Sequence, residues 1–103
     1  MQTLPSLEEL KALIEEATVD CYDEYEQICG LYACLEENLK LPFATEVLGL
    51  SVEVRGLLET ESDIVAECYR GQHCQRISLR ELPLPDPMPL GAEWILAFRQ
   101  WHG

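Results

Sequence analysis

The sequence predicts an α+β fold in a single domain over residues 1–103: two N-terminal helices, a small curled antiparallel sheet or SH3-like barrel of four to five strands, and a short C-terminal helix. Three observations lead to this prediction. Apolar residues recur at three- and four-residue spacing up to about residue 40, which is the helical period. Short alternating stretches separated by glycines follow from Pro42, as strands require, and helical spacing returns after residue 91. A chain of this length buries one hydrophobic core but not two.

The first helix is predicted over residues 4–17, because apolar side chains share one face there: Leu7, Leu10, Leu13, Ile14 and Ala17. Ser6 and Glu9 match a capping box at its start, in which each side chain accepts a hydrogen bond from the other residue's backbone N–H. This helix is expected to dock on the core through its apolar face.

A second helix is predicted from Asp20 to about Lys40, with an apolar stripe that includes Tyr25, Ile28, Cys29, Tyr32, Leu35 and Leu39. Asp20 is its expected N-cap. Gly30 interrupts the helix at a cost of about 1 kcal/mol relative to alanine. The helix has to end before Pro42, because the residue before a proline disfavours helical backbone.

Four short strands are predicted between the second helix and residue 79. Their expected ranges are 43–48, 52–54, 64–70 and 73–79, with a bulge or bend at Gly56 and a polar acidic loop over 58–63. Gly71-Gln72 allows the last two strands to form a hairpin. Residues 82–89 hold four prolines, so they form an extended strap and not a helix or a central strand. Residues 92–101 then predict a short amphipathic helix.

The charge of the chain is strongly negative and unevenly distributed. Nineteen Asp and Glu face seven Lys and Arg, a net charge of −12, and residues 1–63 hold fifteen of the acidic residues but three of the basic ones. Such a surface repels nucleic acid and anionic membranes and attracts cations or basic proteins. No signal peptide or membrane span is evident, so the expected location is cytoplasmic.

An acidic cluster at the start of the second predicted helix is the first candidate for function. Asp20, Asp23 and Glu24 stand at i, i+3 and i+4, which places three carboxylates on one helical face, and Glu26 follows. Ca²⁺ takes six to eight oxygen ligands and tolerates irregular geometry, so such a face could supply part of its shell. Glu61 and Asp63 in the acidic loop, with Glu59, could supply more if the loop folds against the helix. The alternative is a solvated acidic face with Asp20 as a cap.

Other sites are weaker or excluded. An EF-hand starting at Asp20 would need Gly at Tyr25 and Glu at Leu31. Cys68, His73 and Cys74 match no paired zinc signature. Glu36-Glu37 indicates a weak cation site or a solvated face. No catalytic nucleophile, phosphate loop or basic patch is evident, so the chain is not expected to be an enzyme.

The sequence resembles the small acidic cyanobacterial calcium-binding proteins of the heterocyst-regulator type. The resemblance begins with DCYDEYEQICGLYACLEENLKLPFATEVLG at 20–49 and continues through VEV at 52–54, DIVAECYRG at 63–71, LPLP at 82–85 and GAEWILAFRQWHG at 91–103. It implies a cytoplasmic calcium-binding domain without EF-hands and a barrel-like sheet. It also places the ligand role on Asp20, Asp23, Glu24 and Glu26.

The sequence therefore favours a calcium-binding protein that acts as a cytosolic buffer or in signalling through a carboxylate cluster. The competing hypothesis is an acidic interaction module that docks a basic protein partner. A metal site is damaged by a single Asp→Asn or Glu→Gln change, whereas a diffuse acidic face tolerates it.

Overall fold

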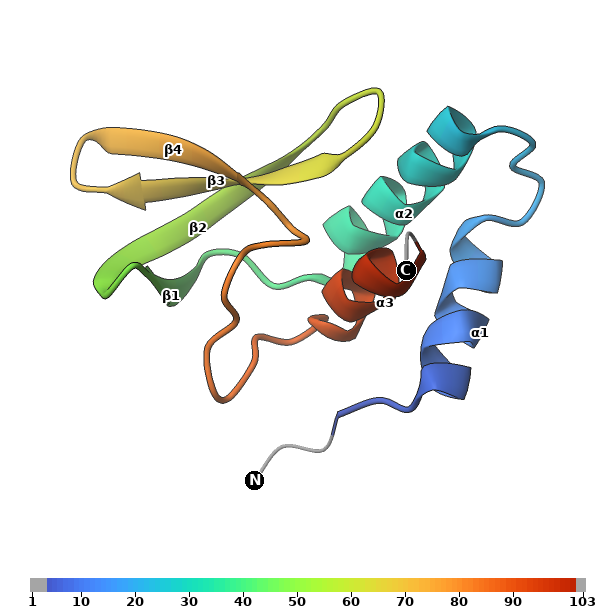
Figure 1. Ribbon diagram of the computed structural model, residues 1–103, viewed down its shortest axis with the longest axis horizontal. Helices are drawn as coiled ribbons and strands as arrows, with labels where there is room; N and C mark the ends of the chain where they lie inside the picture. The colour runs from blue at the N-terminus through green and yellow to red at the C-terminus, as the bar shows by residue number, and fades with distance from the viewer. Residues whose placement is uncertain (1–3, 102–103) are drawn as a thin grey trace.

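The computed structural model describes residues 4–101 and confirms the α+β fold (Figure 1). In chain order the elements are α1 (Leu7–Ala17), α2 (Glu24–Asn38), β1 (Phe43–Val47), β2 (Leu50–Glu59), β3 (Ile64–Arg70), β4 (His73–Ser78) and α3 (Glu93–Trp101). The four strands form one sheet in the order β1-β2-β3-β4, and every neighbouring pair is antiparallel. None of the described helices has the length and apolarity needed to cross a bilayer.

Helix α1 begins as predicted. The Ser6 hydroxyl accepts a hydrogen bond from the Glu9 N–H, and the Glu9 carboxylate accepts one from the Ser6 N–H, which completes the capping box. The helix ends at Ala17, and the Thr18 hydroxyl donates to the Ile14 carbonyl at 2.7 Å.

The N-cap of helix α2 lies three residues later than predicted, and it is not Asp20. Asp23 takes that role, with extended backbone and a carboxylate that accepts from the Glu26 N–H at 2.8 Å. Asp20 instead has a positive φ of 62° in the connection between the helices. The prediction that Asp20, Asp23 and Glu24 share a helical face is therefore wrong.

The contact between the two helices explains the late start of α2. The Ala17 carbonyl at the end of α1 lies against Gly30, in the middle of α2, so closely that a Cβ at Gly30 would collide with it. Six residues of α2, 24–29, precede Gly30, so the first residue of α2 lies about 9 Å from this contact at 1.5 Å per residue. The chain has to cover that distance after Ala17 before α2 can begin. The connection over 18–23 is therefore used to cover that distance and is not helical.

The sheet follows the predicted strands, with one longer member. The bulge falls between Val54 and Gly56, as expected. Strand β2 continues to Glu59, so the acidic loop is shorter than the predicted range 58–63. Strand β1 pairs with β2 up to Val54, and beyond it the Tyr32 hydroxyl of α2 donates to the Leu57 carbonyl at 3.1 Å.

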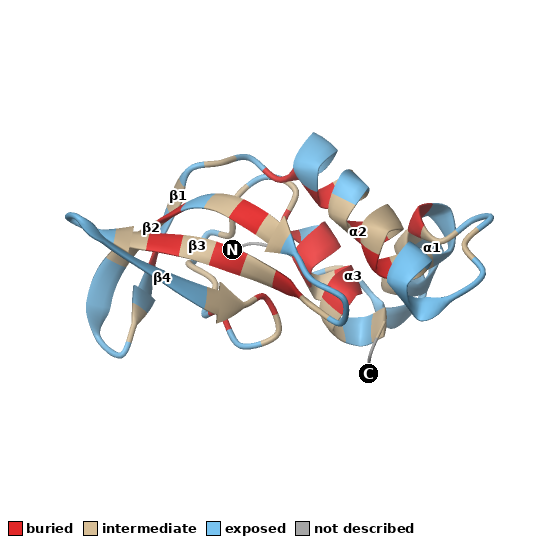
Figure 2. Ribbon diagram, turned by 90° about the horizontal axis from the view of Figure 1, so that it is seen from above, coloured by how far each residue is buried: buried red, intermediate tan, exposed pale blue. Residues whose placement is uncertain are grey.

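The core lies where the helices meet one end of the sheet (Figure 2). Its largest fully buried side chains come from α2, α3, the inner face of the sheet and the strap: Ile28, Leu31, Leu35, Val54, Ile64, Leu79, Leu82, Ile95 and Phe98. The other end of the sheet, which carries the β1–β2 and β3–β4 turns, extends past the helices (Figures 1 and 2).

Candidate metal centre

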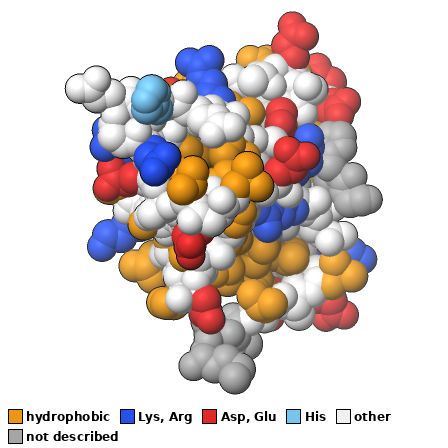
Figure 3. Space-filling model, turned by 60° about the vertical axis from the view of Figure 1, so that its left-hand side comes forward, with side chains coloured by type: hydrophobic (Ala, Val, Ile, Leu, Met, Phe, Trp, Pro, Cys, Tyr) orange, Lys and Arg blue, Asp and Glu red, His pale blue; other side chains and the backbone are white. Residues whose placement is uncertain are grey.

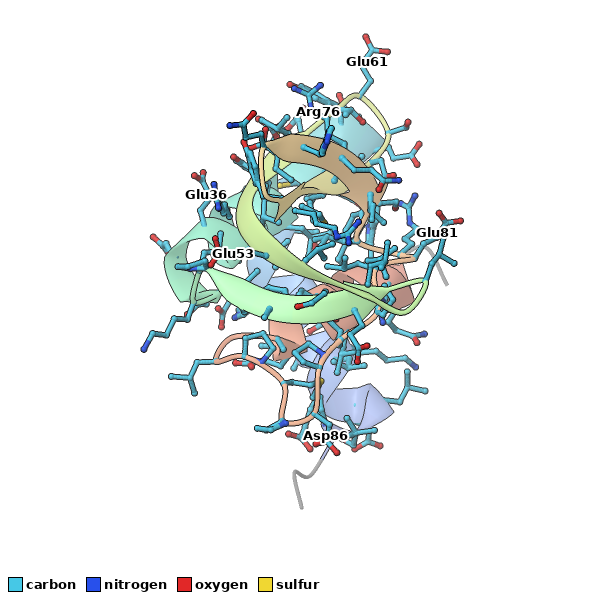
Figure 4. All side chains as sticks on the ribbon, turned by 90° about the vertical axis from the view of Figure 1, so that its left-hand side faces the viewer. Glu36, Glu53, Glu61, Arg76, Glu81 and Asp86 are labelled. Carbon is cyan, nitrogen blue, oxygen red and sulfur yellow. The ribbon has the colours of Figure 1, made fainter. Side chains whose placement is uncertain are left out.

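The start of α2 and the β2–β3 loop together form an open hollow of about 600 Å³, lined by Asp23, Glu24, Tyr25 and Glu61. We call it the acidic hollow. Asp23 and Glu24 come from the first turn of the helix, and Glu61 projects from the loop between the strands (Figure 4). The fold thus brings together carboxylates from two distant segments of the sequence.

Local hydrogen bonds hold both sides of the hollow in place. Asp23 uses Oδ1 to cap α2, which leaves Oδ2 for a ligand, because a carboxylate has four lone-pair sites. In the loop, the Thr60 hydroxyl accepts from the N–H groups of Ser62 and Asp63, and the Thr60 N–H donates to the Asp63 carbonyl. Glu61 is therefore presented at the tip of an ordered turn.

The carboxylates around the hollow contribute part of the pKa shifts of two neighbouring groups, Tyr25 and Cys29. The pKa of the Tyr25 phenol is raised, first by a hydrogen bond with Cys29 and by the Cys29 charge, then by repulsion from Glu59 and Glu61. The pKa of the Cys29 thiol is raised by burial and then by a hydrogen bond with Glu59. Glu59 and Glu61 therefore both act on the first two turns of α2, and a cation there would relieve the repulsion.

The structure places the other three predicted ligands differently. Asp20 lies in the connection before α2, outside the lining of the hollow. Glu26 Oε2 accepts a hydrogen bond from the Tyr22 N–H at 3.4 Å. Asp63 Oδ1 lies 3.4 Å from the Arg80 guanidinium and also accepts from the Ile64 N–H. Of the six predicted residues, Asp23, Glu24 and Glu61 are the ones that line one hollow.

Sequence reasoning missed Tyr25, which it assigned to the apolar stripe of the helix. The side chain is 50% exposed and lines the hollow. Its position directly after Asp23 and Glu24, in the first turn of α2, is the signal that could have identified it.

The donor set of the hollow suits a hard cation. Carboxylate oxygens are the ligands that Ca²⁺ prefers, and an open site lets water complete a shell of six to eight oxygens. Within residues 4–101, no three His, Cys, Asp or Glu side chains are close enough to hold one ion by themselves. The hollow is thus open, and in this conformation its carboxylates do not enclose an ion by themselves.

A soft-metal site on the β3–β4 hairpin is not formed. Cys68 is buried on the inner face of the sheet, whereas Cys74 is exposed and pairs with Tyr69, the next residue of β3, whose side chain points to the opposite face.

A small α+β fold with an open hollow lined by carboxylates is compatible with a calcium-binding protein that has no EF-hand. Comparison with known proteins identifies the family. A family model named for the protein CcbP and described as calcium binding matches residues 11–102, so the chain belongs to the CcbP family of calcium-binding proteins. The predicted resemblance is confirmed, and Ca²⁺ is the metal of this family, which is not an enzyme family.

Two solved structures share the fold. The crystal structure of Anabaena CcbP superposes with a TM-score of 0.71 and 22% sequence identity, covering 99% of this chain and 95% of that one. A calcium-binding protein in its calcium-binding form superposes with a TM-score of 0.69 and 21% identity, covering 99% and 93% of the two chains. No curated protein sequence matches this chain.

Proposed function

We propose that the protein binds Ca²⁺ in the acidic hollow through the carboxylates of Asp23, Glu24 and Glu61. The observation that carries this proposal is that the start of α2 and the tip of the β2–β3 loop, which are far apart in the sequence, present these carboxylates to one open hollow. Membership in a calcium-binding family supports the choice of metal. Bound Ca²⁺ would supply positive charge between carboxylates that otherwise repel one another.

Asp20 and Glu26 belong to the same segment and are proposed as peripheral contributors, directly or through water. Asp63 is the weakest of the six, because Arg80 already neutralises its carboxylate. For the ion to be enclosed, the exposed Glu24 and Glu61 side chains would have to rotate toward Asp23.

The sharpest test is calorimetric titration of the metal-stripped protein with Ca²⁺ in excess Mg²⁺. We expect the double variant Asp23→Asn/Glu24→Gln to lose the tightest binding step while its fold is kept, because asparagine also caps helices well. The variant Glu8→Gln/Glu15→Gln on the exposed face of α1 removes the same charge and should bind Ca²⁺ normally. If both double variants bound Ca²⁺ equally weakly, Ca²⁺ would be attracted to a diffuse acidic surface, as expected for an acidic interaction module.

We further propose that the protein acts as a cytosolic calcium buffer or signalling component. Five free cysteines fit a reducing compartment. A buffer binds Ca²⁺ with little change of shape, whereas a sensor exposes a new surface. NMR chemical-shift changes confined to α2 and the β2–β3 loop would identify a buffer, and changes that extend to the sheet and strap would identify a signalling role.

A further inference from the structure

The end of the sheet farthest from the helices carries an apolar surface that the fold leaves uncovered. It is a groove of about 230 Å³ on the inner face, which we call the hairpin face, and its lining includes Val47, Leu48, Leu50, Val52, Arg70 and His73. Figure 3 shows hydrophobic side chains gathered at this end of the molecule, with basic side chains and the histidine on one side.

Exposure along β2 shows that the groove continues the core side of the sheet. Leu50, Val52 and Val54 alternate along the strand and therefore share one face. Val54 is fully buried by the helices, Val52 is half-buried, and Leu50 is 45% exposed. The same face that packs against the helices at one end is open at the other.

Leu48 is the residue that most strongly indicates a binding role for the groove. It occupies the tip of the β1–β2 hairpin with a positive φ of 52°, and its side chain is 97% exposed. Asparagine or glycine takes this backbone conformation with less strain, and either would also avoid exposing an apolar side chain. No packing within the described residues explains a leucine there, which is why strain at such a position points to binding.

The charge at the hairpin face indicates what kind of partner fits. Arg70 and His73 are paired across β3 and β4, and both side chains lie on the inner face beside the groove. No carboxylate pairs with Arg70 among residues 4–101. The molecule is 40 Å long, and the Debye length is about 8 Å at physiological salt, so the acidic hollow has little influence here.

We propose that the hairpin face docks a partner protein through a short segment in which one large apolar side chain is flanked by Asp or Glu. The apolar side chain would fill the groove beside Leu48 and Leu50, and the acidic residues would pair with Arg70 and His73. The groove is smaller than the 300–1,000 Å³ that is usual for small-molecule sites. This favours insertion of a single side chain.

The hairpin face and the acidic hollow lie at opposite ends of β2. Leu50 begins the strand at the groove, and Glu59 ends it beside the hollow. At about 3.3 Å per residue the two ends are roughly 30 Å apart. The docking proposal therefore does not depend on where Ca²⁺ binds, and variants of the hairpin face should keep normal calcium affinity.

Selection of a phage-displayed library of random short peptides on the full chain tests the proposal. We expect enrichment of sequences with a large apolar residue between Asp or Glu. A synthetic copy of an enriched peptide should bind at least tenfold more weakly to Leu48→Asn and to Arg70→Glu, as measured by fluorescence anisotropy. Arg76→Glu, which changes the same charge on the outer face of the same hairpin, should bind normally.

Other outcomes overturn the proposal. Enrichment of basic or uncharged peptides, no enrichment, or equal loss of binding in Arg76→Glu would each contradict it. Sedimentation would show whether the chain forms dimers without a peptide. If dimers form and are lost in Leu48→Asn, the occupant of the groove is a second copy of the chain and the proposal is wrong. Leu48→Asn should also raise Tm by about 4–8 °C because it relieves the backbone strain, which separates lost binding from lost folding.

Discussion

Gly30 lies where α1 and α2 touch, and the contact leaves no room for a side chain. A Cβ there would collide with the Ala17 carbonyl oxygen and would also lie 3.4 Å from the Cys21 sulfur. The residue that weakens α2 by its backbone freedom therefore permits the close approach of the two helices. Because the obstacle is backbone, it cannot move aside as a flexible side chain could.

Gly30→Ala is expected to destabilise the protein although alanine favours helix. Helix propensity would add about 1 kcal/mol of stability, but overpacking typically costs about 1–3 kcal/mol, and a clash with backbone belongs at the upper end. We expect a net loss of about 1–2 kcal/mol in the free energy of unfolding, measured by urea denaturation.

The reverse change on the exposed side of the same helix is the control. Ala33→Gly should cost about 1 kcal/mol through propensity alone, because Ala33 is exposed. A Gly30→Ala protein that is more stable than the original would show that α1 and α2 separate easily.

Asp23 contributes to the helix and to the proposed site at once. Its carboxylate caps α2, where negative charge also interacts favourably with the helix dipole. The preceding Tyr22 is held by Glu26, so the backbone on either side of Asp23 is restrained before any ion binds. This restraint positions one of the proposed ligands in advance, whereas the position of Glu61 depends on the β2–β3 loop.

At the scale of elements, the segment over residues 79–92, which contains the strap, joins the sheet to α3 through backbone carbonyls and one arginine. Arg99 of α3 donates from Nε to the Leu79 carbonyl at 2.7 Å and from Nη2 to the Leu82 carbonyl. Burial lowers the pKa of its guanidinium, which nonetheless stays charged at neutral pH. The Thr45 hydroxyl of β1 donates to the Pro83 carbonyl at 2.7 Å.

Arg99→Lys should weaken this connection although it keeps the charge. The ammonium is a compact donor and cannot reproduce a planar fork that reaches two carbonyls. Losing one such charge-assisted hydrogen bond costs about 1.5–3 kcal/mol, which thermal unfolding would detect as a lower Tm. Arg76→Lys on the exposed face of β4 is the control and should leave Tm unchanged, and an equal decrease in both variants would contradict a special role for Arg99.

Strand β2 also depends on an element beyond the sheet. Its second half has no β1 neighbour, and α2 takes that place through the hydrogen bond from Tyr32 to Leu57. This contact fixes the distance between α2 and the end of β2.

At the scale of the whole molecule, the net charge of −12 opposes compaction. Ca²⁺ should therefore stabilise the fold by mass action, by about 2.7 kcal/mol at a free concentration one hundred times the Kd. Calorimetric scans in calcium and in a chelator should show a higher Tm with calcium. Sodium chloride at the same ionic strength is the control. An equal rise in Tm with sodium chloride or with Mg²⁺ would indicate charge screening and not a specific calcium site.

Much of the fold could be predicted because its signals are local. Ser6 and Glu9 form the capping box within one turn, β3 alternates over residues 64–70, and the prolines of the strap exclude helix wherever they fall. The charge of the molecule, its membership in a calcium-binding family and the acidic segment at 20–26 were also evident in the order of residues.

The tertiary structure decided which of the acidic residues meet. Asp20 is the cap that the sequence predicts, but Asp23 caps α2 in the structure, where α1 ends against Gly30 and residues 18–23 connect the two helices. Glu61 and Asp63 are neighbours in one loop, yet Glu61 lines the hollow with Asp23 and Glu24, whereas Asp63 lies 3.4 Å from Arg80. The sequence by itself determined most of the elements, since these follow from short-range spacing, and its resemblance to a calcium-binding family indicated the kind of ion. Which carboxylates converge depends on contacts between segments far apart in the chain, and such contacts exist only once the helices have packed against the sheet.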